Sequence, residues 1–343
     1  MPATAIEITR SHRVESTAAL DLAVVDSRGC FVAWVGDPQH PAYWRSSAKP
    51  FQALPMVLSG AADDFDLSEQ ELAIVSASHG GEPRHLALVQ SILAKIRAQP
   101  SDLICGKDWP ITAAARDDLI ANGKSPTVLH NNCSGKHSGM LMLATQLGAP
   151  WTDYHHSDHP VQKAIVESVR TMTGLSAQEE LATGVDGCGV PTFYLPLSRM
   201  AFAFAQLVDP RRLDPSMQSA AHRVAEAVRR YPEIISGEGR LEQRLAVATK
   251  YRVAAKGGAE AVFCLGIPER GWGLAMKIAD GSPRALGPAL IDILKQLGLM
   301  DSSALEAVQD LIEPIVRNQQ GVAVGEVRSV VRLSWARIGL SLA

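Results

Sequence analysis

Two pairs of short apolar segments, one pair near each end of the chain, constrain the fold more than any other feature of the sequence. Residues 20–36 are predicted to form two strands around a turn at 26–29, because the Asp, Ser and Gly residues there favour a tight hairpin. A second pair of strands is predicted at 261–265 and 274–278, around a loop that contains a proline and a glycine. The sequence therefore favours an antiparallel sheet that draws on both ends of the chain.

Amphipathic helices are predicted between and after these strand pairs. Apolar residues recur there at three- and four-residue spacing, the pattern of a helix with one buried face. The predicted helices span 83–98, 137–147, 160–174, 194–207, 214–231 and 286–298. Because no linker or internal repeat is evident, we expect one α/β (α+β) domain over residues 1–343, with a helical subregion at roughly 83–250.

The composition favours a folded protein with a small-molecule ligand. Of the 343 residues, 46% are hydrophobic, which is enough for a substantial core. The net charge is -3 and no Lys/Arg block exceeds two residues, so neither nucleic acid nor a membrane is an expected partner. No apolar run approaches the roughly 18 residues that span a bilayer. Glu15 and Asp21 interrupt what would be the apolar core of an export signal, so we expect a soluble, cytoplasmic protein.

The five cysteines are odd in number and widely spaced. Without an export signal, this pattern argues against a disulfide framework and favours free thiols in a reducing compartment. Cys264 lies in an apolar predicted strand, as expected of a buried structural cysteine. Cys133 and Cys188 instead lie in polar loops that contain glycine, so these two thiols are the candidates for chemistry.

The segment 45–50 contains an SxxK pattern, formed by Ser46 and Lys49. On a helix, residues three apart share a face, so the serine hydroxyl would lie beside the lysine amine. A lysine with a depressed pKa can take the serine proton and so create a nucleophile. A solvated surface pair gives the same pattern. Pro50 also disfavours helical angles at Lys49, which would delay the start of the helix to Pro50.

A second candidate segment spans residues 76–83 and contains Ser78. It follows the apolar run 72–75 and precedes a predicted helix, so we interpret the region as a strand, a tight polar loop and a helix. Backbone donors and small hydroxyls at a helix N-terminus suit an oxyanion or a carboxylate. An ordinary capped loop explains this segment equally well.

The most specific segment is NNCSGKHSG at residues 131–139, between a strand predicted to end at Leu129 and a helix. Cys133 is followed by Lys136 and His137 near the N-terminus of that helix, where positive potential lowers the pKa of a thiol. Cys133 is therefore a candidate thiolate ligand or a candidate nucleophile.

Two further loops contain candidate metal-binding or catalytic side chains. Cys188 lies in DGCG, residues 186–189, where the flanking glycines permit close approach. Two cysteines in such loops suggest a shared metal, usually zinc, with His137 or a neutral Lys136 as a further ligand. Lys256 stands beside two glycines before a predicted strand and resembles the lysine-glycine element that accompanies SxxK in β-lactamase-like enzymes. Without the other motifs, Lys256 would be interpreted only as a lysine in a loop, with no assigned function.

Taken together and in order along the chain, these segments resemble the Rhizobium etli-type L-asparaginase II family. NNCSGKHSG is the most specific element, DGCG is less specific, and the other segments agree in order and spacing. The resemblance implies a serine β-lactamase/penicillin-binding-protein-like fold, a homodimer, a bound zinc ion, and hydrolysis of L-asparagine to L-aspartate and ammonia.

The resemblance also implies a role for each motif residue. Ser46 with Lys49 would form the first catalytic Ser-Lys pair, and Ser78 with Lys256 the second. The other roles would fall to the zinc ligands Cys133, Lys136 and Cys188, with water in the open position, and to the supporting residues His137 and Asp186.

We hypothesise that Ser46, activated by Lys49, attacks the side-chain amide carbon, and that backbone N–H groups stabilise the oxyanion. Ser78 and Lys256 would then assist hydrolysis of the aspartyl ester. Zinc would orient the charged backbone groups of the substrate, because a separate nucleophile is available. The sequence does not decide between asparagine and glutamine as the substrate, since one methylene changes the binding free energy by only about 1–3 kcal/mol.

Three alternatives stay open on the sequence alone. The first is a Cys-His amidase or glutaminase with Cys133 as nucleophile and His137 as base. The second is a penicillin-recognising enzyme, since SxxK alone fits it. The third is a noncatalytic zinc-binding or thiol-sensing protein in which the Cys133 and Cys188 loops close a structural site.

Overall fold

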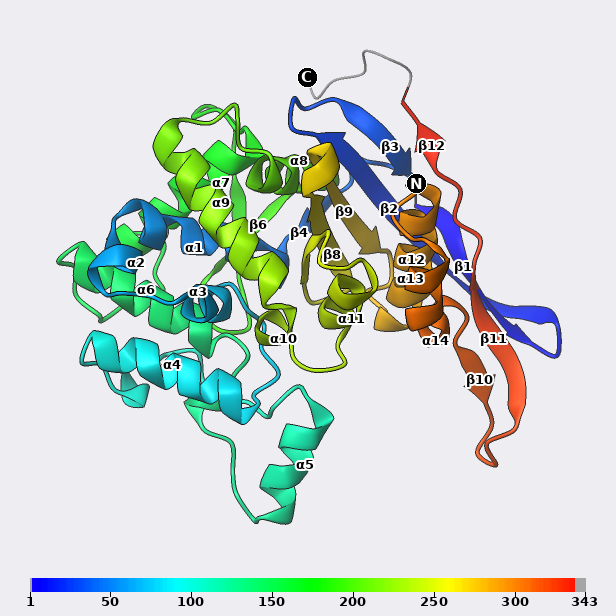
Figure 1. The fold of residues 1–343 in the computed structure, drawn as a ribbon, viewed down its shortest axis with the longest axis horizontal. Coiled ribbons are helices and arrows are strands. Elements are labelled where there is room, and N and C mark those ends of the chain that lie inside the picture. Colours follow the sequence, from blue (N-terminus) through cyan, green and yellow to red (C-terminus); the bar gives the residue numbers. More distant parts are fainter. Residues whose placement is uncertain (1, 337–343) are drawn as a thin grey trace.

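The computed structural model describes residues 2–336. Within them, an antiparallel sheet of nine strands has helices on both faces and a large helical region beside it (Figure 1). Seven strands follow the order β10-β11-β1-β2-β9-β8-β7, while β3 pairs with β2 and β12 pairs with β3. Their bounds are β1 Ala3–Arg10, β2 Arg13–Asp26, β3 Phe31–Val35, β7 Ala254–Gly257, β8 Val262–Ile267, β9 Trp272–Ile278, β10 Ile315–Arg317, β11 Ala323–Ser329 and β12 Ser334–Trp335.

The long strand β2 separates two hydrophobic cores. Successive side chains of a strand point to opposite faces of the sheet. Leu22 and Val24 therefore pack into one core, and Ala23 and Val25 pack into the other. The turn from β2 to β3 contains Gly29 with φ +83°, an angle that favours glycine. Both predicted strand pairs, β2 with β3 and β8 with β9, are confirmed.

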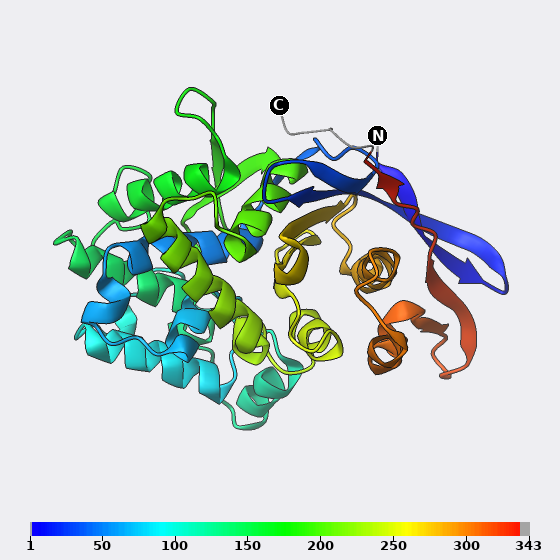
Figure 2. The ribbon, with the colours of Figure 1, turned by 45° about the horizontal axis from the view of Figure 1, so that its top comes forward.

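Most of the remaining chain is helical. Helices lie on both faces of the sheet, and Figure 2 shows the orange helices after β9 beneath the blue N-terminal strands. The helices are α1 Lys49–Leu58, α2 Ala61–Asp64, α3 Glu69–Val75, α4 Pro83–Lys95, α5 Ala113–Ala121, α6 Ser134–Gln146, α7 Pro160–Thr173, α8 Leu197–Val208, α9 Pro215–Arg230, α10 Pro232–Ile235, α11 Leu241–Ala248, α12 Leu286–Gln296, α13 Ser302–Ala307 and α14 Gln309–Ile312.

A second sheet of three short strands lies in the middle of the chain. Its order is β4-β6-β5. The strands are β4 Pro41–Tyr43, β5 Ala182–Val185 and β6 Pro191–Pro196. The loop that joins β5 to β6 is the DGCG segment, so this small sheet fixes the position of Cys188.

The expected architecture, strands from both chain ends with helices in the middle, is confirmed. Each of the six predicted helices is present, although α8 begins only after β6 has ended at Pro196. The single-domain interpretation of residues 1–343 stays a prediction. Within residues 2–336, none of the helices combines the length and the apolar character that crossing a bilayer requires.

Two predicted strands are wrong. The apolar run 72–75 lies in helix α3, because Ser68 and Glu71 form reciprocal hydrogen bonds that start a helix at Glu69. The segment that ends at Leu129 is a 3-10 turn, Val128–His130. Lys256, expected in a loop before a strand, lies within β7.

Helix α8 packs closely on β2, β8 and β9 because glycine leaves room for it. A Cβ atom on Gly273 of β9 would lie 1.9 Å from the carbonyl oxygen of Ala201 in α8, and backbone cannot move aside cheaply. The close contact between this helix and the sheet therefore requires glycine, which has no side chain, at position 273.

We expect Gly273→Ala to lower the free energy of unfolding by roughly 2–3 kcal/mol, because the added methyl forces α8 off the sheet. Denaturant titration measures this change. Gly287→Ala is the matched control: that glycine lies inside α12, its nearest neighbour would be at 3.6 Å, and alanine is the better helix former. Equal stability of the two variants would contradict the proposed close approach.

Candidate active site

Lys49 is buried and is the first residue of helix α1, most of whose side chains pack into the core. A 3-10 turn at Arg45–Ala48 leads into α1, which begins at Lys49. Pro50 is tolerated because the first helical N–H groups have no partner within the helix. The helix start is thus one residue earlier than expected. The rings of Trp44 and Phe51, with centroids 4.7 Å apart, pack this turn into the interior.

A serine hydroxyl lies between two buried lysine amines. Nζ of Lys49 is 2.9 Å from Oγ of Ser78, and Nζ of Lys256 is 3.0 Å from the same oxygen. Lys49 also donates to the carbonyl oxygen of Ala77 at 2.7 Å, and Lys256 donates to that of Gly257 at 2.7 Å. Two residues far apart in sequence thereby converge on one hydroxyl.

Burial sets the protonation of both amines. Desolvation disfavours the charged form of an amine and lowers its pKa. Burial lowers the pKa of Lys256 to about 7. Burial also lowers the pKa of Lys49. At neutral pH a neutral amine is therefore accessible here, and it can accept a proton from a serine.

Ser46 and Ser78 line one cavity of about 570 Å³. Ser46 is half-buried, and within residues 2–336 its hydroxyl makes no hydrogen bond with Nζ of Lys49; only the backbone N–H of Lys49 bonds to the carbonyl oxygen of Ser46. The structure thus brings Lys49 to Ser78, whereas the sequence paired it with Ser46. The polar part of the cavity wall is formed by Ser46, Ser78, Asn132, Arg240, Glu242 and Glu260.

A buried cluster of two thiols and one amine lies close to Lys49. Cys133 is the residue directly before α6, and Cys188 lies in the loop between β5 and β6. Nζ of Lys136 is 2.9 Å from Sγ of Cys188. All three side chains are buried. The structure therefore brings together the three residues that the resemblance assigned to zinc.

The cluster concentrates negative charge on Cys133. Hydrogen bonding with Cys188, together with the Lys49 and Lys136 amines, outweighs burial and holds the pKa of Cys133 well below its ordinary value. Burial alone would lower the pKa of Lys136, but the two cysteines raise it. Two sulfurs and one nitrogen suit zinc with an open fourth position, provided that Lys136 loses its proton on binding.

The two supporting residues stand near the cluster residues in the sequence: His137 follows Lys136, and Asp186 precedes Cys188 by two residues. Nδ1 of His137 is 2.7 Å from the hydroxyl of Tyr154, while its buried Nε2 has no partner in the described part of the chain. Burial holds the pKa of His137 well below its ordinary value. Oδ1 of Asp186 accepts a hydrogen bond from Nε of Arg45 at 2.8 Å. This ion pair ties the DGCG loop to the residue before Ser46.

The pKa of Asp186 is low despite its burial. Burial would raise it, but the Lys136 amine, the Gly187 amide and the Arg45 guanidinium together hold it below its ordinary value. Asp186 is therefore a carboxylate at neutral pH, and it can counter the charge of the neighbouring cations.

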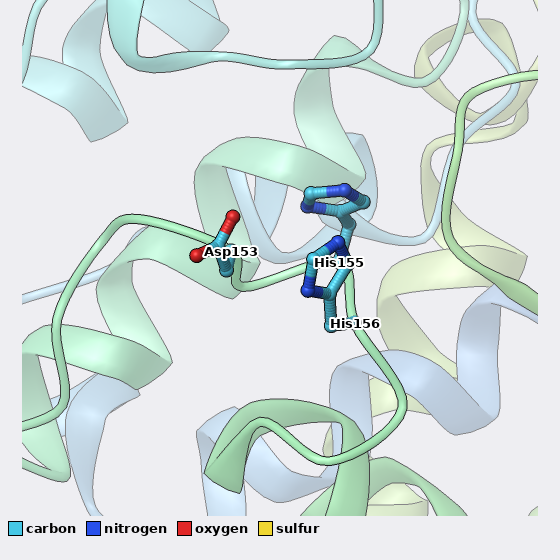
Figure 3. Close-up of side chains that lie close together, drawn as sticks. All are labelled: Asp153, His155 and His156. Carbon is cyan, nitrogen blue, oxygen red and sulfur yellow. The ribbon is translucent and has the colours of Figure 1, made fainter.

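One group of metal-ligand side chains was not singled out from the sequence. Asp153, His155 and His156 place their ligand atoms within 4.8 Å of one another (Figure 3). Among the described residues, they form a candidate metal-binding group in a loop after α6, separate from the Cys133 cluster. The signal in the sequence was an aspartate two residues before a pair of histidines.

Sequence reasoning missed other polar residues of the site. Asn132 offers its backbone carbonyl to Nζ of Lys49 at 3.2 Å, and Ser47 donates to the backbone carbonyl of Lys256 at 2.8 Å. Arg240 and Glu242 line the cavity from α11 and the residue before it. Asn132 could have been found from the NNCSGKHSG stretch, but α11 carries no recognisable motif.

The family comparison covers most of the chain. A family model described as L-asparaginase II matches residues 6–329. No curated protein sequence matches this chain at a significant level.

Two solved structures are similar to much of this chain at low sequence identity. A β-lactamase from Mycobacterium bovis is 13% identical, with a TM-score of 0.44 over 81% of this chain and 94% of that one. A penicillin-binding protein homologue from Pyrococcus abyssi is 12% identical, with a TM-score of 0.39 over 91% of this chain and 84% of that one.

The low pKa of Lys256 makes stability depend on pH in a defined direction. Burial holds its pKa at about 7 in the folded state, against an ordinary value of 10.5. Between these values the unfolded chain binds more protons than the folded one. The contribution of Lys256 to the free energy of unfolding therefore rises by about 2 kcal/mol from pH 7 to pH 9.

Lys256→Met removes this contribution, so the stability advantage of the variant over wild type should shrink by that amount from pH 7 to pH 9. Denaturant titration at several pH values measures it. Lys163→Met, at an exposed position of α7, serves as the control. A difference between Lys256→Met and wild type that stays constant with pH would contradict the neutral, buried amine.

Proposed function

Because this chain belongs to the L-asparaginase II family, a family of amidohydrolases, we propose that it hydrolyses the side-chain amide of L-asparagine to L-aspartate and ammonia. One observation carries the proposed Ser-Lys chemistry. The hydroxyl of Ser78 lies within hydrogen-bond distance of both Lys49 and Lys256, in the wall of a cavity that Ser46 also lines.

Ser46 is the proposed nucleophile, since it is the more exposed of the two cavity serines. Its Oγ attacks the amide carbon of the substrate, and its proton passes through the hydroxyl of Ser78 to the amine of Lys49, whose pKa burial lowers. The resulting oxyanion is stabilised by backbone N–H groups. When the C–N bond breaks, the leaving nitrogen takes a proton from the Lys49 ammonium through Ser78, and ammonia departs.

Hydrolysis of the aspartyl ester completes the cycle. Lys256 and Lys49 both contact Ser78, so a proton can move between the two amines through one hydroxyl. A water molecule gives its proton to this network as it attacks the ester carbon. Collapse of the second tetrahedral intermediate returns a proton to Ser46 and releases L-aspartate.

Cys133, Lys136 and Cys188 are the proposed zinc ligands. When bound there, zinc would supply a fixed positive charge that orients polar groups of the substrate. The residues themselves have further effects. The Cys133 and Lys136 charges act on the pKa of Lys49, and Asp186 holds Arg45 directly before Ser46. The cluster and Asp186 can therefore bind the metal and also influence Lys49 and the segment that contains Ser46.

A Cys-His amidase is the second candidate, because the low pKa of Cys133 favours a thiolate nucleophile. His137 would be its base, yet Nδ1 of His137 is engaged by Tyr154. The proposed homodimer and the proposed cytoplasmic location rest on the resemblance and on the composition.

We expect Ser46→Ala to lower kcat for ammonia release from asparagine by about 10⁴-fold or more, since the nucleophile is lost. Ammonia release from asparagine and glutamine, measured in parallel, also sets the substrate preference. Ser59→Ala at the other end of α1 is the control and should keep full activity.

Trapping the acyl intermediate and locating it by mass spectrometry separates the candidate nucleophiles. The acyl group should lie on Ser46. Near-native turnover of Ser46→Ala, or an adduct on Cys133, would overturn the serine mechanism.

We expect Cys133→Ala to lose bound zinc and to raise KM for asparagine by about tenfold, with kcat changed much less, because the metal positions the substrate. Metal analysis of the purified protein and steady-state kinetics measure the two effects. Cys30→Ser, at a half-buried cysteine outside the cluster, should keep its zinc. If a chelator unfolds the protein instead of weakening substrate affinity, the zinc is structural.

A further inference from the structure

A guanidinium group with no hydrogen-bond partner within residues 2–336 lines the cavity that contains both serines. Arg240 precedes α11 and lines the cavity together with Ser46 and Ser78. Its Nε is buried and has no hydrogen-bond partner in the described residues. Within residues 2–336 no carboxylate lies in ion-pair distance of its guanidinium. An unpaired buried donor is costly, so such a group in a cavity wall indicates a ligand that pairs with it.

The acidic residue of the cavity wall that follows Arg240 most closely in the sequence is already engaged. Glu242, two residues later in the chain, is buried in the same cavity wall. Its Oε1 accepts a hydrogen bond from the backbone N–H of Gly257 at 3.0 Å, which fixes the carboxylate against β7. Glu242 also acts electrostatically on Lys256. Arg240 therefore keeps its charge available to the cavity.

Arg240 is close enough to the reacting groups to contact the same small molecule. Its charge acts on Lys256, whose amine lies 3.0 Å from Oγ of Ser78. In asparagine the α-carboxylate is only three C–C bonds, each about 1.5 Å, from the amide carbon. When Ser46 attacks that carbon, the carboxylate must lie in the same cavity.

We propose that Arg240 binds the α-carboxylate of the substrate and so restricts the site to amides that carry a carboxylate a short distance from the scissile bond. The inference rests on the proposed function, whose site it deepens. A guanidinium offers two parallel N–H donors to a carboxylate, which fixes the orientation of the substrate as well as its affinity. The cavity of about 570 Å³ is roomy for asparagine, so a directional anchor is needed to hold the amide at Ser46.

The test compares L-asparagine with 3-aminopropanamide, which is asparagine without its α-carboxylate. Arg240→Ala should lower kcat/KM for asparagine by roughly 10- to 100-fold, the loss of a charged hydrogen-bonded pair, mainly through KM. It should change kcat/KM for 3-aminopropanamide less than threefold. Arg240→Lys should recover part of the loss for asparagine, since it restores the charge without the two parallel donors.

Arg244→Ala is the matched control. Arg244 stands four residues later on α11 and pairs with Asp310 outside the cavity, so both substrates should be unaffected. An equal loss for both substrates with Arg240→Ala would show that Arg240 acts only on Lys256 or on the fold. No loss for either would show that the carboxylate lies elsewhere. Either result overturns the inference.

Binding of L-aspartate separates this inference from the proposed reaction. Calorimetry should give a Kd for L-aspartate that is roughly 10- to 100-fold weaker in Arg240→Ala than in wild type. If wild type released no ammonia from asparagine but this difference held, the proposed function would fail and the carboxylate site would stand. Equal affinity of the two proteins would overturn the carboxylate site whatever the activity.

Discussion

The structure depends on the burial of three lysine side chains in one region of the interior. Lys49, Lys136 and Lys256 are among the largest fully buried side chains of the described residues. An ammonium group in a poorly solvated position is strongly disfavoured unless it is paired or loses its proton. The three lysines resolve this constraint in different ways, and the chemistry of the site follows from the difference.

Lys49 and Lys256 are buried and form no ion pair among the described residues, and burial lowers their pKa values. Each donates to a backbone carbonyl, and both contact the hydroxyl of Ser78. Lys136 instead lies against two thiols, which keep it charged and draw negative charge onto Cys133. One interior region thus contains two amines with lowered pKa values, suited to proton transfer, and a charged thiol cluster suited to a metal.

The fold brings these groups together from separate layers. The edge strand β7 carries Lys256, the first residue of α1 is Lys49, and the loop after α3 carries Ser78. A hydrogen bond from Ser47 to the backbone of Lys256 joins the turn before α1 to the sheet. Because both sheet faces are packed against helices, these backbone positions are rigid, and the distances between the amines and the serine are set by the core.

The sequence by itself determined the local elements and the chemical identity of the site. Periodicity located both hairpins and six helices, and the NNCSGKHSG stretch pointed to the family whose model matches residues 6–329. It misassigned the run 72–75, because four apolar residues fit a buried strand and a buried helix equally well and the Ser68–Glu71 cap decided between them. Local spacing also suggested that Lys49 would meet Ser46.

Only the tertiary structure decided that Ser78 lies between Lys49 and Lys256, and that Arg240 lines the same cavity with no hydrogen-bond partner among the described residues. Ser78 and Lys256 are 178 residues apart in the chain. Spacing along a helix or strand fixes which side chains share a face, but contacts over such separations depend on how the layers pack. Burial, which sets the pKa of the lysines, is likewise a property of the packed structure and not of any local segment.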